Sequence, residues 1–112
     1  MLATLAALAE PNRLRIVELL RAGPRPVGEI SAALKLRQPQ VSKHLQHLRG
    51  AGLVVVHPVA QQRVYELRAA PLAELHAWTE QYRQLWQERF DGLAAVIQDL
   101  KQRETKGDRK KP

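Results

Sequence analysis

Apolar residues recur at helical spacing in four separate stretches of the first half of the chain. Apolar positions three and four residues apart indicate one buried face of an α-helix. The spacing predicts helices over about 2–9, 11–21, 27–34 and 38–50. Pro11 suits the first turn of the second helix, and Glu10 before it can serve as the N-cap.

For two of these helices, the spacing predicts which residues are buried. In the second helix, the predicted core residues are Leu14, Val17 and Leu20, and Arg13 is expected to point outward. In the fourth helix, one buried stripe is predicted for Val41, Leu45 and Leu48. The tight connection over 35–37 joins the third helix to the fourth.

The spacing of apolar residues along the chain changes after Gly52. Residues 53–56 are short and β-branched, and residues 63–67 alternate between polar and apolar. With a polar turn through Pro58, Gln61 and Gln62 between them, these segments predict a β-hairpin. A helical period returns at Pro71, which predicts one long helix to about residue 103 and a charged, flexible tail over 104–112.

The predicted order is α-α-α-α-β-β-α, a mainly α fold with a small β-hairpin. Two short helices joined by a tight turn and followed directly by a hairpin form a winged helix-turn-helix. The 112 residues fit one domain. We therefore expect one DNA-binding and dimerisation domain over 1–103, followed by the tail at 104–112.

Charge and composition narrow the function. The formal net charge is +7, but residues 101–112 hold six basic and two acidic side chains, so the rest of the chain carries only +3. The chain has no cysteine, which excludes disulfides and thiolate metal sites. The apolar N-terminus lacks the basic segment of a signal peptide, and no apolar run approaches the roughly 20 residues of a membrane span. We expect a cytoplasmic protein with no membrane partner.

The helix predicted over 38–50 carries the clearest functional signal. Residues 35–49 include four basic side chains and no acidic one, whereas the rest of 1–100 has eight basic and nine acidic residues. Glutamine can pair with adenine, lysine suits guanine O6 and N7, and serine or arginine suits phosphate oxygens. An ordinary solvated helix face is the alternative, but such a face usually includes Glu or Asp. The predicted hairpin forms the wing of this fold, and it contributes Arg63. The predicted DNA-binding residues are Arg37, Gln38, Gln40, Ser42, Lys43, Gln46, His47 and Arg63.

The last predicted helix carries four of the five aromatic residues of the chain, each four positions from the next. A short domain cannot cover so long an apolar stripe, so a second copy of the helix is expected to pack on it. The predicted dimer-interface residues are Leu75, Trp78, Tyr82, Trp86, Phe90, Leu93 and Ile97. A ligand pocket lined by Trp78, Tyr82 and Trp86 is the alternative for the same residues.

Three segments together resemble the ArsR family of bacterial winged-helix repressors: residues 10–20, residues 38–48 and Ala51–Val54. The resemblance covers about residues 2–100. It implies a homodimer that binds double-stranded DNA at an imperfect palindrome and usually represses transcription. It also implies that Gln38, Ser42 and Lys43 occupy positions that family members use to touch DNA.

The chain departs from the family pattern at several positions. Lys35 stands where the family often has Gly in the helix-turn-helix turn, and Arg37 stands where it often has Ser. The family's cysteine metal motif is absent from 26–31, and Glu74 with His76 supplies only half of its other metal site. We expect no metal and no cofactor, which with the aromatic last helix resembles a metal-independent branch.

Two other functions remain open from the sequence. One is a ligand-responsive sensor with a pocket at the dimer interface and an effector of unknown identity. The other is a winged-helix module that binds protein or RNA, although such a module would not need an acid-free face at 35–49. An enzyme is not expected, because no phosphate-binding glycine loop and no nucleophile–base–acid set stands out.

Overall fold

A computed structural model describes the backbone of residues 1–110 and the side chains of residues 1–105. The chain divides into two compact units, Met1–His76 and Ala77–Pro112. The two units are therefore described in turn.

Four helices form most of the first unit: α1 (Leu2–Leu8), α2 (Pro11–Leu20), α3 (Val27–Leu34) and α4 (Gln38–Gly50). The bounds predicted for the third and fourth helices are confirmed. The predicted cap of α2 is confirmed as well, because the backbone N–H of Arg13 donates to Glu10 Oε2 at 2.7 Å. Proline follows directly at the first helical position, where its missing N–H costs nothing.

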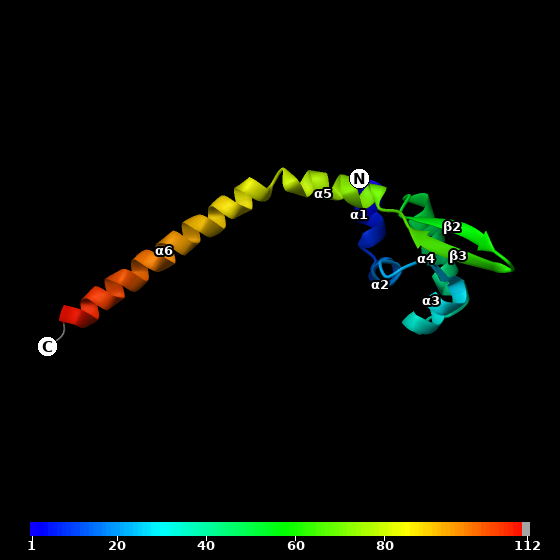
Figure 1. Cartoon of the computed structure of the whole chain (residues 1–112), viewed down its shortest axis with the longest axis horizontal. Helices are drawn as coiled ribbons and strands as arrows, with labels where there is room; N and C mark the ends of the chain where they lie inside the picture. The colour runs from blue at the N-terminus through cyan, green and yellow to red at the C-terminus, as the bar shows by residue number, and fades with distance from the viewer. Residues whose placement is uncertain (111–112) are drawn as a thin grey trace. The chain divides into compact units, whose positions relative to one another are not determined.

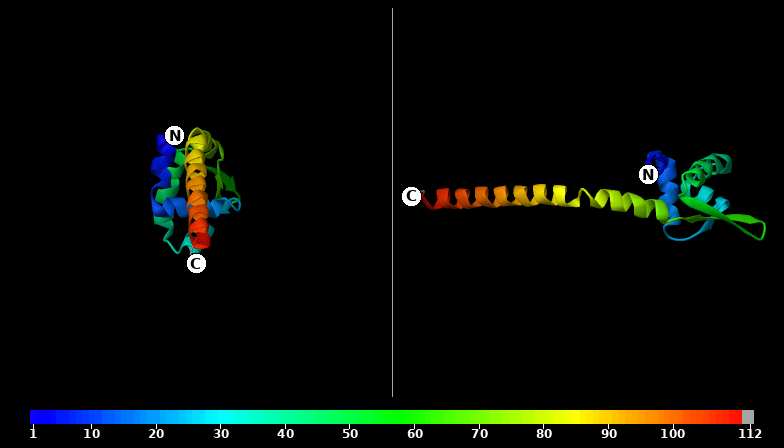
Figure 2. Two further views of the ribbon diagram at one scale, coloured as in Figure 1. Left: turned by 90° about the vertical axis from the view of Figure 1, so that its left-hand side faces the viewer. Right: turned by 90° about the horizontal axis from the view of Figure 1, so that it is seen from above.

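A three-stranded antiparallel sheet completes this unit, with the order β1-β3-β2. The predicted hairpin is confirmed as β2 (Val54–Val59) and β3 (Gln62–Leu67), which run side by side in Figures 1 and 2. Its turn lies at residues 60–61 and not at Pro58, which sits inside β2 opposite Arg63. Because β2 is an edge strand, it tolerates a residue without an N–H. The short strand β1 (Arg25–Pro26) was not predicted.

The core of the first unit lies between the helices and the sheet. The predicted stripe of α4 is confirmed, since Val41, Leu45 and Leu48 are completely buried. In α2 the assignment of Leu14 was wrong: Leu14 is 41% exposed. The buried face of α2 consists of Ile16, Val17 and Leu20. This face places Arg13 at the edge of the core, half-buried rather than pointing outward as predicted.

The predicted single long helix is two helices. Helix α5 (Ala70–Glu80) begins in the first unit, and α6 (Arg83–Lys110) belongs to the second. Between them, the N–H groups of Gln81 and Tyr82 bond to carbonyls three residues earlier, which ends α5. Helix α6 continues past the end predicted at 103, and residues 111–112 of the predicted tail lie outside the described residues. No helix in the described part of the chain is long and apolar enough to cross a membrane.

Candidate nucleic-acid interface

One face of α4 holds the helix to the domain and the other is free. The stripe of Val41, Leu45 and Leu48 is completely buried, and burying a leucine side chain contributes about 1.5–3 kcal/mol. Seven of the eight predicted DNA-binding residues lie on or next to this helix, and all eight are exposed. The structure therefore leaves a surface of amides, a hydroxyl, an imidazole and cations along α4.

The turn before α4 is fixed by backbone contacts. Lys35 ends α3 in the left-handed conformation, with φ 56° and ψ 42°. The N–H of Leu36 donates to the carbonyl of Ser31 at 3.1 Å, and the Ser31 hydroxyl donates to the carbonyl of Leu36. Arg15 of α2 donates to the Leu34 carbonyl at 3.2 Å. These contacts set the direction in which α4 leaves the turn.

Gln40 caps the N-terminus of α4, a role that was not predicted from the sequence. Its side-chain Oε1 accepts a hydrogen bond from the backbone N–H of Arg37, the N-cap residue, at 3.3 Å. Such a bond satisfies one of the N–H groups that the helix leaves unpaired at its start. The side-chain carbonyl oxygen of Gln40 therefore caps the helix, and its NH₂ group takes no part in this bond.

His44 lies on the flank of α4 and faces the domain. Its side chain is 20% exposed, and Nδ1 lies 3.6 Å from Glu10 Oε2. The same carboxylate oxygen caps α2 through Arg13. His44 thus lies against the N-terminus of α2 and stands apart from the exposed face.

The wing comes close to the start of α4. Residues of both elements line a groove of about 570 Å³ with the first turn of α3. Gln38 of α4 and Arg63 of β3 both line this groove. Gly28 lies next to the Gln38 side chain, because a Cβ added to it would be in ordinary van der Waals contact with Gln38 Nε2, at 3.7 Å. The one carboxylate lining this groove, Glu29, pairs with Arg25 at 3.7 Å.

The predicted interface residues of the second unit form an exposed apolar surface. Tyr82, Trp86, Phe90, Leu93 and Ile97 are between 44% and 65% exposed. Trp78 meets Tyr82 edge to face at 5.3 Å between ring centroids, and Trp86 meets Phe90 at 6.1 Å. Leu75 is the exception, because it is half-buried in the first unit.

No group of three or more His, Asp or Glu side chains that could hold a metal lies together among residues 1–105. Glu74 and His76 therefore gain no further acidic or histidine ligand within that part of the chain.

A helix after a tight turn, followed by a two-stranded hairpin, defines the winged helix-turn-helix class. The family model described as "Bacterial regulatory protein, arsR family" matches residues 10–56. The HTH-type transcriptional regulator Rv2034 of Mycobacterium tuberculosis is 38% identical over 91 residues, which cover 81% of this chain and 82% of the relative.

Solved structures agree with this match. A crystal structure of an ArsR family transcriptional regulator superposes with a TM-score of 0.68 and 26% identity, over 76% of this chain and 93% of the other. The homodimeric winged helix-turn-helix DNA-binding domain Mb0332 of Mycobacterium bovis superposes with a TM-score of 0.61 and 31% identity, over 70% and 72%.

The chain belongs to the ArsR family. It is a DNA-binding transcriptional regulator and not an enzyme.

Proposed function

We propose that the chain is a homodimeric repressor that binds an imperfect palindrome in DNA, with α4 of each copy in the major groove. The observation that carries this proposal is the exposed, acid-free surface of α4 above a completely buried stripe. A recognition helix must be held rigidly by one face while the other presents hydrogen-bonding groups to base edges. The helix would act on DNA in the bacterial cytoplasm.

Within this surface we assign different tasks to different residues. Lys43 and Gln46 lie on the outward face of α4 and suit base edges, with Lys43 on guanine O6 and N7. Arg37, Ser42 and Arg63 suit phosphate oxygens, which set the position of the protein on the duplex. Gln38 and Gln40 lie at the start of α4, where their NH₂ groups can reach either a base or the backbone.

The dimer in this proposal forms through the exposed apolar stripe of the second unit. Four large apolar side chains of α6 are more than half exposed (Phe90, Leu93, Val96 and Leu100), and Leu85 and Trp86 are each 49% exposed. Such a stripe on a soluble chain is costly unless a partner covers it. The homodimeric state of the Mycobacterium bovis domain supports a second copy as that partner.

Selection of bound sequences from a random DNA pool tests the proposal. We expect enrichment of a palindrome whose half-sites lie about one helical turn, roughly 10 base pairs, apart. Recovery of unrelated sequences with no shared motif would refute sequence-specific binding. Recovery of a single half-site without its symmetric copy would refute the dimeric mode.

A further inference from the structure

A second groove borders α4 at its C-terminal half, away from the wing. It has a volume of about 450 Å³ and is lined by residues of α1, α2 and the end of α4. Its walls are mostly alanine and glycine: Ala3, Ala6, Ala7, Gly50 and Ala51. Its polar side chains are Arg13, Gln46 and His47, so no carboxylate lines it.

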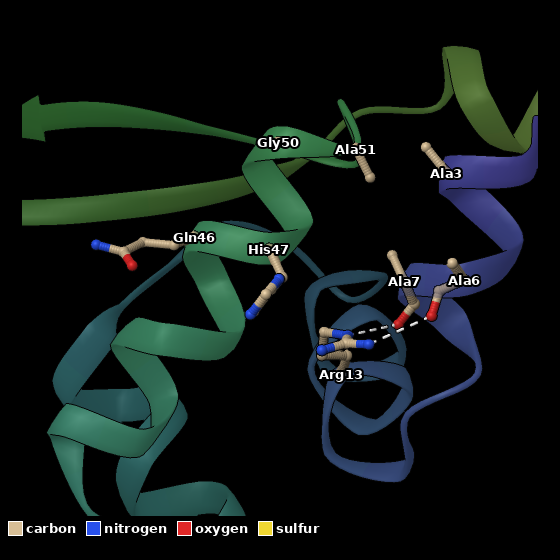
Figure 3. A pocket seen from close by; sticks show the side chains of 8 residues that line it. All are labelled: Ala3, Ala6, Ala7, Arg13, Gln46, His47, Gly50 and Ala51. Carbon is tan, nitrogen blue, oxygen red and sulfur yellow. Dashed lines mark hydrogen bonds between the residues drawn. The ribbon is translucent and has the colours of Figure 1, made fainter.

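Arg13 is held firmly at the side of this groove. Its Nε donates to the carbonyl of Ala7 at 2.8 Å and its Nη2 to the carbonyl of Ala6 at 3.3 Å. These bonds fix the guanidinium at the end of α1, as Figure 3 shows. Among the described contacts they leave the two N–H groups of Nη1 for another acceptor. A guanidinium is always charged and suits oxyanions.

The side chains of His47 and Gln46 both line the groove, and they leave α4 in different directions (Figure 3). The two basic side chains, Arg13 and His47, therefore approach the same space from two different helices. Glu10, the acidic residue closest to Arg13 in sequence, does not line the groove, and its Oε2 is used by the cap of α2.

We propose that this groove is an oxyanion site in which Arg13 and His47 bind one phosphate group from opposite sides. The proposal rests on the proposed DNA-binding function, because α4 would then carry a phosphate contact at each end. Gln38 and Arg63 would serve the strand beside the wing, and Arg13 with His47 the strand on the other side of the major groove. In this arrangement His47 contacts a phosphate and not a base edge, and Arg13 joins the interface.

The same chemistry fits two sources of phosphate, the DNA backbone and a free anion. Backbone phosphates are contacted in every DNA sequence, so such a contact changes affinity without changing specificity. A free anion in the groove would instead compete with DNA for His47 and release the operator.

The test replaces single phosphates of a selected operator with neutral methylphosphonates and measures binding by wild type, His47→Ala and Gln46→Ala. We expect one linkage in each half-site at which wild type loses about tenfold in affinity. His47→Ala should lose about the same factor in affinity for intact operator and for unrelated DNA. The methylphosphonate at that linkage should then lower the affinity of His47→Ala little further. Gln46→Ala is the matched control, because it should lose operator preference and still respond to the linkage.

A second arm adds inorganic phosphate to the DNA-free protein at constant ionic strength and follows the Arg13 side-chain N–H and the His47 ring by NMR. Phosphate-induced shifts that vanish in His47→Ala would assign the site to a free anion, if no methylphosphonate linkage weakens the binding of wild type. If no linkage weakens DNA binding and inorganic phosphate causes no shifts, the proposed site is wrong. Wild type that shows no preference for its selected operator would instead overturn the proposed function, so the two failures are distinct.

Discussion

Replacing Lys35 with glycine should stabilise the protein. Lys35 holds φ 56° and ψ 42° at the end of α3, a conformation that costs a residue with a Cβ roughly 1–2 kcal/mol. Glycine avoids this cost, but its greater conformational entropy stabilises the unfolded chain by about 0.4–1 kcal/mol. The difference of these ranges is a gain of up to about 1.6 kcal/mol in stability, centred near 0.8 kcal/mol, or roughly 3–6 °C in Tm for a unit of this size.

Lys35→Ala is the control, because it removes the same charge and keeps the Cβ. The assay is thermal and urea unfolding of wild type and both variants, followed by circular dichroism at one fixed protein concentration. We expect the glycine variant to be the most stable of the three and the alanine variant to stay close to wild type. A glycine variant no more stable than the alanine variant would show that the turn carries no backbone strain.

Three further predictions concern the core, the dimer and the tail. Leu45 is completely buried, so Leu45→Ala should cost about 2–5 kcal/mol in the free energy of unfolding; a loss below 1 kcal/mol would contradict its place in the core. Trp86→Glu should convert dimers to monomers in sedimentation, and dimers that persist unchanged would refute the interface. Removing 104–112 should lower salt-sensitive, non-specific affinity and leave the preference for the operator intact; a lost preference would give the tail a role in recognition.

The helix-turn-helix was predictable because its periodic pattern is strong. The stripe of Val41, Leu45 and Leu48 fixes both the existence of α4 and its outward face. The hairpin was predictable from the change of period, but its turn was not. Proline at 58 signals a turn locally, and only the sheet order shows that β2 is an edge strand that accepts it.

The remaining differences come from tertiary contacts that leave no local signal. Strand β1 has two residues and no alternation, and it exists through pairing with Tyr65 and Val64. The break between α5 and α6 falls at Gln81 and Tyr82, where no glycine or proline marks it.

Arg13 was assigned to solvent by the choice of Leu14 as a core residue. The spacing of Arg13, Ile16, Val17 and Leu20 at i, i+3, i+4 and i+7 would have placed it on the inner edge of α2.

The central claim is that the outward face of α4 reads DNA sequence, and Lys43 tests it most directly. The measurement is the ratio of affinities for the selected operator and a scrambled duplex, by fluorescence anisotropy at one salt concentration. Lys43→Ala should lower this ratio by about 5- to 150-fold, because a base contact carries roughly 1–3 kcal/mol of discrimination. Arg63→Ala, as a phosphate contact, should weaken both affinities and keep the ratio. A Lys43→Ala protein with the wild-type ratio would contradict the account.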